Sequence, residues 1–193
     1  MSSVPQQVQT PPRVYVSFSA EVNPHTTEAL IAALANCANQ GVQEVYLALS
    51  TPGGSVMNGM NLYNVMRAMP FKLITHNVGN VDSIGNVMFL AGEERCASPH
   101  STFMFHGVGF NPDGARLEEK LLRERLNGIL ADQKRIGSVI EERTQLAGNK
   151  IKALFREAGT KDAAYAASVG IVHQVRELQI PAGSPIVSLV FQR

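Results

Sequence analysis

The 193-residue sequence is poor in cysteine, in aromatic residues and in charge, and it lacks long apolar runs. Only 6% of the residues are aromatic, the net charge is +1 and no basic block occurs, so nothing supports nucleic-acid binding. Residues 1–12 lack the basic and apolar regions of a signal peptide, and no apolar run approaches the roughly 18 residues of a membrane helix. These absences predict a soluble, cytoplasmic protein that does not bind a membrane.

The two cysteines, Cys37 and Cys96, are predicted to be buried thiols. Cys37 falls on the apolar face of an expected helix and Cys96 falls in an expected short strand, and free cysteine is among the most buried residue types. No metal-ligand spacing surrounds either residue. The sequence therefore implies no metal and no organic cofactor.

The remaining composition is typical of a globular protein, with 45% hydrophobic and 17% charged residues. A chain of this length suits one domain and buries roughly 70% of its unfolded surface. No internal repeat, low-complexity segment or second boundary interrupts it. We expect residues 1–12 to be a mobile tail and residues 13–193 to form a single domain.

Apolar residues switch between strand spacing and helix spacing along the first half of the chain. Alternation or continuous apolar runs predict strands at 13–19, 45–49, 71–78, 95–97 and 102–105. Helical spacing predicts helices over about 24–38, 56–69 and 83–91, the first with Asn23 as N-cap and Pro24 at its first position. This alternation with short turns predicts a predominantly parallel α/β architecture with right-handed crossovers.

A long amphipathic helix follows the turn signal at residues 110–114. Its apolar face runs from about 117 to 146, and roughly thirty residues is long for a domain of this size. Periodicity alone leaves two arrangements open: the helix projects and packs against a partner subunit, or it lies across the body. Beyond it we expect a short helix at 151–155, a helix at 163–169 capped by Asp162, and closing strands at 171–175 and 185–191.

Ser83 stands where an apolar strand gives way to a helix, and two interpretations of it are open. A helix N-terminus leaves backbone N–H groups unpaired and carries partial positive charge. The serine is either a helix cap, for which Ser is a preferred residue, or a nucleophile whose oxyanion those N–H groups stabilise. Taken alone, the position favours the cap.

Two further segments make the nucleophile interpretation of Ser83 more attractive. Gly53-Gly54 follows another strand, where a glycine pair lets backbone N–H groups approach a substrate, although a tight turn needs the same residues. His106 ends a third strand, either as a general base or as an ordinary packed histidine. Sites in open α/β sheets gather at the carboxyl ends of strands, so all three segments can meet at one edge.

At these residues the sequence resembles the proteolytic subunit of the Clp protease, from about Val14 through Val175. The family's Ser-Pro-Gly-Gly turn appears here as Thr51-Pro52-Gly53-Gly54-Ser55-Val56. Its nucleophile segment appears as Asp82-Ser83-Ile84-Gly85, and its Met-Ile-His segment appears as Met104-Phe105-His106. Each motif alone is weak, but the three together are specific.

The resemblance implies a serine endopeptidase that cleaves polypeptide substrates inside an oligomeric ring chamber. It implies Ser83 as nucleophile, His106 as general base, and the backbone N–H groups of Gly54 and Ile84 as oxyanion hole. It also implies a spiral core of ββα units, shared with crotonases, and a protruding handle helix at about 117–146. In the family this helix interleaves with that of an opposing ring, so a homo-oligomer of stacked rings is expected.

Three departures from the family pattern stand out. The third member of the triad is an aspartate in the family, and its position falls on Ala158 in this sequence. The adjacent Glu157 is our candidate for that role. Asp162 is the next acidic residue, but it falls at an expected helix cap. Otherwise the site is a dyad or is impaired. Asp82 replaces a small residue, and it either faces inward, where it would raise the pKa of a nearby His106, or faces solvent. Only about a dozen residues precede the first strand, which disfavours docking to a AAA+ unfoldase.

Three hypotheses of function result. The first is a Clp-like serine peptidase, motivated by Ser83, His106 and Gly54. The second is a catalytically impaired ring subunit with a structural or regulatory role, motivated by Ala158. The third is a crotonase-like acyl-CoA enzyme, because the core is shared, although the Ser–His pair speaks against it.

Overall fold

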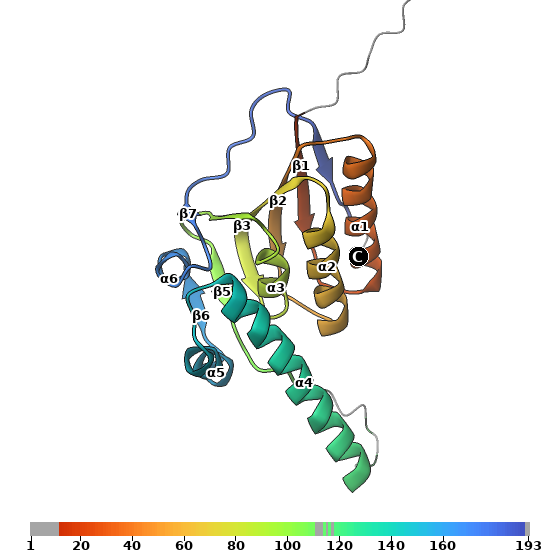
Figure 1. Cartoon of the computed structure of the whole chain (residues 1–193), viewed down its shortest axis with the longest axis vertical. Helices are drawn as coiled ribbons and strands as arrows, with labels where there is room; N and C mark the ends of the chain where they lie inside the picture. Colours follow the sequence, from red (N-terminus) through yellow and green to blue (C-terminus); the bar gives the residue numbers. More distant parts are fainter. Residues whose placement is uncertain (1–11, 111–113, 115, 117, 192–193) are drawn as a thin grey trace, which may run out of the picture.

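The computed structural model describes residues 12–110, 114, 116 and 118–191; residues 1–11 of the expected tail, residues 111–113 of the expected turn and residue 117 lie outside this part. Strands and helices alternate as the sequence predicts (Figure 1). In chain order the elements are β1 (Arg13–Ser19), α1 (Pro24–Asn39), β2 (Glu44–Thr51), α2 (Val56–Ala68), β3 (Lys72–Asp82), α3 (Gly85–Phe89), β4 (Glu94–Ala97), β5 (Thr102–Met104), α4 (Glu119–Arg143), α5 (Gly148–Glu157), β6 (Thr160–Asp162), α6 (Ala163–Ser168), β7 (Gln174–Val175) and β8 (Ile186–Ser188).

The strands form one sheet in the order β6-β5-β3-β2-β1-β8. β3 is the longest strand, and two strands share its outer edge in turn. The middle of β3 pairs with β4, and β4 in turn pairs with β7. The last residues of β3 pair with β5. All these pairs are parallel except β5–β6, which is antiparallel. The expected mostly parallel sheet is confirmed.

The main core lies between the sheet and helices α1, α2 and α3, which gather on one side of it (Figure 1). Alternate residues of the strands supply it, because successive side chains of a strand point to opposite faces. On β2, Val45, Leu47 and Leu49 are fully buried there. The buried residues of α1 that meet them include Leu30 and Leu34.

A second, smaller cluster lies on the opposite face of the sheet. It contains Tyr15, Tyr46, Ile74 and Cys96, with Leu178 packed against it. Tyr15, Tyr46 and Ile74 are neighbours across three paired strands, so their side chains stand in one row. Cys96 belongs to this cluster and Cys37 to the main core, and the prediction that both thiols are buried is confirmed.

Two predicted helix caps are confirmed. The side chain of Asn23 accepts a hydrogen bond from Thr26 N, and the Thr26 side chain accepts one from Asn23 N, which is a reciprocal capping box. Pro24 follows at the first helical position, where its missing N–H costs nothing. At α6 the Asp162 carboxylate accepts from Tyr165 N at 2.7 Å.

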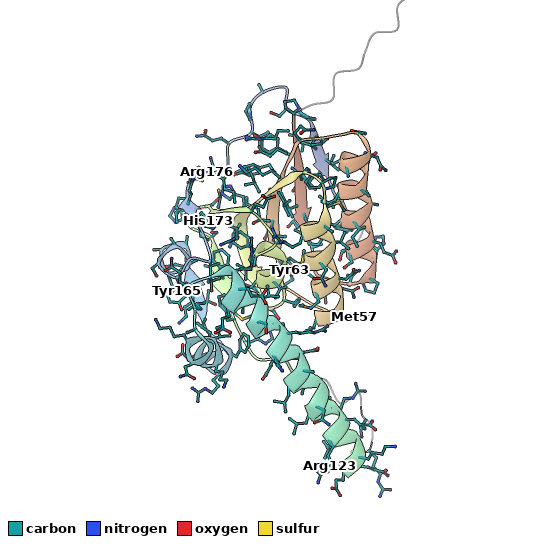
Figure 2. All side chains as sticks on the ribbon, in the orientation of Figure 1. Met57, Tyr63, Arg123, Tyr165, His173 and Arg176 are labelled. Atoms are coloured by element: carbon teal, nitrogen blue, oxygen red, sulfur yellow. The ribbon has the colours of Figure 1, made fainter. Side chains whose placement is uncertain are left out.

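Helix α4 runs from Glu119 to Arg143, shorter than the predicted 117–146, and it lies partly across the body and partly projects from it. Its last turns pack on the body through buried Ile136, Val139 and Ile140. Its first turns project away from the body (Figure 1), and Arg123 marks this far part in Figure 2. Leu122, Leu126 and Leu130 of the projecting part are 44%, 54% and 53% exposed.

Several predicted bounds are wrong. β3 continues to Asp82, four residues beyond the expected end at 78, because its outer edge pairs with β5 after β4 ends. Helix α5 spans Gly148–Glu157 rather than 151–155. The closing strands cover only residues 174–175 and 186–188. The sequence does not predict strand β6, since its three residues are polar and show no alternation.

A buried arginine joins the last elements of the chain to the sheet. Arg95 on β4 is 4% exposed and donates to the carbonyl oxygens of Gly92, Arg143, Gly170 and Ile171 at 2.7–3.2 Å. Burial lowers the pKa of Arg95 to about 10, and the nearby Arg143 acts in the same direction. The guanidinium stays charged at neutral pH. Its N–H groups are paired with backbone carbonyl oxygens, most of which lie at the end of α4 or just after α6.

Candidate active site

Ser83 occupies a strained turn between β3 and α3. Its φ is +56°, the left-handed region that non-glycine residues seldom adopt. The N-cap of α3 is Ile84 and no side chain caps this helix, so the helix-cap interpretation of Ser83 is wrong. The expected helix over 83–91 is also shorter, at 85–89. The left-handed turn lifts Ser83 out of both elements at the carboxyl end of β3.

The Gly53-Gly54 turn approaches Ser83 closely. Gly53 has φ +87°, and a Cβ atom there would lie 2.6 Å from Ser83 Cβ and 2.8 Å from Asp82 O. Gly54 has φ +141° and is held by Val22, which donates to Gly53 O and accepts from Ser55 N. Glycine is therefore required at both positions, by conformation and by the approach to neighbouring backbone.

Two backbone N–H groups at this turn are free. Among the hydrogen bonds of residues 12–110, 114, 116 and 118–191, none uses the N–H of Gly54 or of Ile84 as donor. Ile84 is buried, and buried N–H groups are nearly always paired in folded proteins, whereas Gly54 is exposed and its N–H can bond to solvent. The two free donors flank Ser83 and are available to an acceptor that enters from outside.

His106 follows β5 at the same edge of the sheet. Its Nδ1 lies 2.7 Å from Gly107 O. A carbonyl oxygen can only accept, so Nδ1 carries the proton and Nε2 of the neutral ring holds the lone pair. Within the described part of the chain no hydrogen bond joins His106 to Ser83 Oγ, and the imidazole is exposed. Catalytic hydrogen bonds are often long in unliganded enzymes and tighten only in the substrate complex.

Ala158 lies just beyond the antiparallel pair of β5 and β6. The last paired residues of that ladder are Met104 and Thr160, and a hydrogen bond from Phe105 N to Gly159 O follows them. Ala158 ends α5 in the left-handed region, with φ +49°. Its methyl group offers nothing to a ring N–H.

The Glu157 carboxylate is not directed at His106. It pairs with Lys161 at 3.5 Å, and its side chain is 59% exposed. The structure thus brings Gly54, Ser83, Ile84 and His106 together and leaves Glu157 outside. Asp82 turns away as well, because its carboxylate accepts from Asn80 Nδ2 at 2.6 Å.

A cavity of about 120 Å³ joins the four residues that come together. Gly54, Ser83, Ile84 and His106 all line it, and its apolar wall includes Ile136 and Ile140 of α4 and Phe155 of α5. Sequence reasoning missed one polar residue of this wall, Asn86, because an amide within an apolar helix carries no motif. It also missed the Gly107 carbonyl, which no side-chain pattern reveals.

The part of the chain that the structure describes holds no group of three His, Cys, Asp or Glu side chains placed to bind a metal ion. Nor does any helix in that part have the length and apolar character needed to cross a bilayer.

The Clp protease family model matches residues 12–179. The chain belongs to the Clp protease family. A curated relative, the ATP-dependent Clp protease proteolytic subunit 1 of Leifsonia xyli subsp. xyli (strain CTCB07), is 27% identical over 150 residues, which cover 72% of this chain and 71% of the relative.

A solved structure of similar fold is that of a point mutant of ClpP1 from Listeria monocytogenes. It superposes with a TM-score of 0.77 over 86% of this chain and 92% of its own, at 19% sequence identity. At that identity the likeness concerns the fold alone. It confirms the predicted α/β class and the Clp protease fold.

Proposed function

We propose that this member of the Clp protease family is a serine peptidase in which Ser83 is the nucleophile and His106 the general base. The observation that carries the proposal is the single cavity lined by Gly54, Ser83, Ile84 and His106, with two free N–H groups beside the serine. Family membership favours peptide hydrolysis over the acyl-CoA chemistry that a shared core allows.

In the proposed reaction Ser83 Oγ attacks the carbonyl carbon of a peptide bond while His106 Nε2 takes the hydroxyl proton. The carbonyl oxygen becomes an oxyanion and accepts hydrogen bonds from Gly54 N–H and Ile84 N–H. The tetrahedral intermediate then collapses, and the imidazolium returns the proton to the leaving amine. The same imidazole then deprotonates a water, which attacks the acyl carbon. When this second intermediate collapses, the imidazolium returns the proton to Ser83 Oγ and the carboxylic acid product leaves.

The Gly107 carbonyl takes the orienting role that a carboxylate has in a triad. It accepts from His106 Nδ1 and so keeps the lone pair on Nε2, the nitrogen that must receive the serine proton. A carbonyl carries no full negative charge and stabilises imidazolium less than a carboxylate does. We therefore expect a dyad that turns over more slowly than a complete triad, and Glu157→Gln to leave its rate unchanged.

The apolar wall supports a preference for an apolar side chain next to the cleaved bond. Ile136, Ile140 and Phe155 offer it a surface without charge.

A second candidate function is a catalytically impaired ring subunit. Two observations favour it: alanine stands at position 158, where the family resemblance places the aspartate of the triad, and Ser83 Oγ makes no hydrogen bond with the imidazole in the described part of the chain. In this case the chain would build a chamber together with an active relative.

The test is intact-mass analysis of the purified protein after exposure to a small fluorophosphonate. We expect one phosphonyl adduct in the wild type and none in Ser83→Ala, with slow labelling in His106→Ala. Glu157→Gln serves as the matched control, because it changes a neighbouring acid that does not line the cavity. A folded, oligomeric wild type that forms no adduct would contradict the peptidase proposal and favour the impaired subunit.

The partners proposed for the chain are further copies of itself and a polypeptide substrate. The projecting turns of α4 expose Leu122, Leu126 and Leu130, a stripe of large apolar side chains that suits burial against another subunit. We propose that α4 joins stacked rings through this stripe. Docking to a AAA+ unfoldase is a separate proposal, which mixing with such an ATPase in a degradation assay would test.

A further inference from the structure

Asn86 lies in α3 directly behind the serine turn, and its side chain connects the two segments of the proposed dyad. The residue is 2% exposed. Its Nδ2 donates to Ser83 O at 3.0 Å and to Met104 O at 2.8 Å. Both acceptors are carbonyl oxygens, which only accept, so the amide must turn its NH₂ group toward them.

The oxygen atom of the same amide has an unusual environment. Asn86 Oδ1 is buried and has no hydrogen-bond partner among the residues that the structure describes. A buried acceptor without a donor costs free energy, and such groups in folded proteins call for a specific explanation. An apolar side chain would avoid that cost. The explanation we find is the pair of hydrogen bonds that the NH₂ group makes.

Those hydrogen bonds act on a strained residue. Ser83 with its φ of +56° persists only if its surroundings hold it there. Its N–H donates to Met104 O at 2.9 Å, and its carbonyl accepts from both Asn86 N and Asn86 Nδ2. One of these three bonds therefore comes from a side chain.

The same side chain reaches the strand that carries the base. Met104 ends β5, and His106 follows two residues later. Met104 O accepts from both Ser83 N and Asn86 Nδ2, so the serine turn and the end of β5 are joined at one carbonyl. A shift of either segment would change the distance between Ser83 Oγ and the imidazole.

We propose that Asn86 is a positioning residue, which holds Ser83 in its left-handed turn and fixes that turn to the strand end bearing His106. This inference rests on the proposed function of Ser83 and His106. Asn86 does not touch the reacting atoms in this role. It acts through the geometry of the dyad, where a displacement of about 1 Å costs on the order of 10²-fold in rate.

The test measures the second-order rate of fluorophosphonate labelling at Ser83, and kcat and KM for a short peptide, in Asn86→Ala. Both carbonyls keep a backbone donor in this variant, from Asn86 N and Ser83 N, so we expect it to fold. We expect labelling and kcat to fall about 10- to 100-fold with KM within about twofold. Asn86→Asp has the same shape but no NH₂ group, and we expect at least the same loss.

Asn77→Ala is the matched control. Asn77 is also a buried asparagine of β3, and its Nδ2 donates to Thr102 O at 2.7 Å, at the other end of β5. We expect this variant to be less stable than the wild type. Its labelling rate should stay within about threefold of the wild-type rate, provided that each protein is assayed the same number of degrees below its own melting temperature.

The outcomes separate the inference from the proposed function. Wild-type protein labelled at Ser83 together with equal rates in Asn86→Ala or Asn86→Asp would overturn the role of Asn86 alone. That role is also overturned if Asn77→Ala slows labelling as much as Asn86→Ala does, because the effect would then be general loosening. Failure of the wild type to label at Ser83 contradicts the proposed function itself.

Discussion

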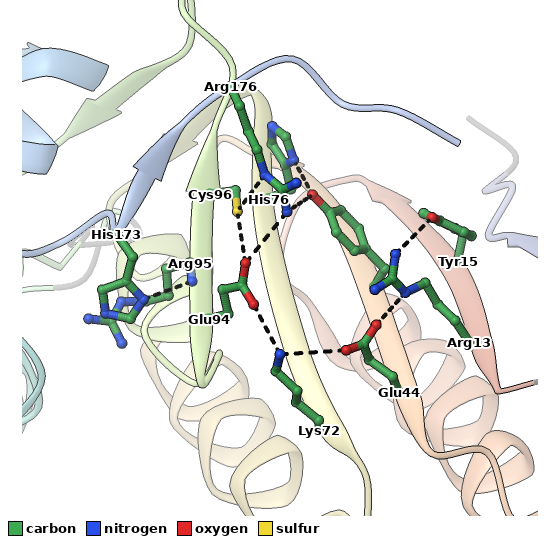
Figure 3. Close-up of polar contacts among 11 residues, drawn as sticks. Arg13, Tyr15, Glu44, Lys72, His76, Glu94, Arg95, Cys96, His173 and Arg176 are labelled. Carbon is green, nitrogen blue, oxygen red and sulfur yellow. Dashed lines mark hydrogen bonds and ion pairs between the residues drawn. The ribbon is translucent and has the colours of Figure 1, made fainter. Parts of the chain in front are cut away.

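His76 makes the stability of the protein depend on pH in a way that can be worked out from its surroundings. Its side chain is fully buried on β3, at the face of the sheet away from the three helices (Figure 3). Nδ1 lies 2.7 Å from the Tyr46 hydroxyl and Nε2 lies 3.2 Å from Ser98 Oγ. Arg176 reaches across the same face to Tyr46 and to Glu94.

Burial lowers the pKa of His76 from 6.5 to about 4, and the positive charge of Arg176 acts in the same direction. The unfolded chain takes up this proton near pH 6.5, whereas the folded chain takes it up only near pH 4. Between these values acid favours the unfolded state. One pKa unit corresponds to 1.36 kcal/mol, so the protein loses about 3 kcal/mol of stability through His76 as the pH falls from 6.5 to 4.

The assay is urea unfolding of wild type and His76→Gln at pH 7, 6, 5 and 4, at one fixed protein concentration. Glutamine does not titrate, and carboxylates affect both proteins alike, so the difference between the two curves isolates His76. We expect the stability advantage of the wild type to shrink by about 3 kcal/mol toward pH 4.

Curves for wild type and His76→Gln that stay parallel from pH 7 to pH 4 would refute this reasoning. They would mean that His76 titrates alike in both states, which requires water to reach the ring in the folded protein. A gap that widens on acidification would refute the sign as well, since it would mean that the folded state favours imidazolium.

Three other expectations concern stability and assembly. Arg95→Met removes the side-chain donor of the Arg143, Gly170 and Ile171 carbonyl oxygens, whereas Gly92 O keeps a hydrogen bond from Arg143. This variant should lower the free energy of unfolding by at least about 3 kcal/mol in urea titrations, whereas Arg123→Met, at an exposed position, should change it by less than about 0.5 kcal/mol. Asp162→Ala removes the cap of α6 and should cost about 1 kcal/mol by the same measurement. Leu126→Glu should dissociate the proposed stacked rings in sedimentation experiments while leaving the unfolding of the subunit nearly unchanged; intact stacks in this variant would contradict the role of α4.

The sequence could predict those parts of the fold that local chemistry controls. The cap at Asn23 and the cap at Asp162 follow from side chains that bond to backbone within three residues. The strands of the parallel sheet follow from apolar runs that must be buried on both faces. The ends of β3 and α4 were less predictable, because they depend on which distant segments pack alongside them.

The candidate site was predictable as a set of residues but not as a geometry. Motif spacing pointed to Gly54, Ser83 and His106, and the structure brings these to one cavity. The left-handed turn at Ser83 depends partly on the hydrogen bond from Ser83 N to Met104 O, a distant segment that no pattern around Ser83 contains. It also depends on Asn86, whose role no motif marks. The expectation for Glu157 rested on nearness in sequence, whereas its carboxylate pairs with Lys161.

The parallel pairing of β1 with β8 joins strands that are translated at different times. Residues 15–17 pair with residues 186–188, which the ribosome adds roughly 170 residues later, or about 10 to 30 s at 5–20 residues per second. Until then the outer edge of β1 has open N–H and carbonyl groups, and an open edge is a template for pairing with other chains. Newly made chains of this protein therefore pass through an aggregation-prone interval that ends only when β8 docks.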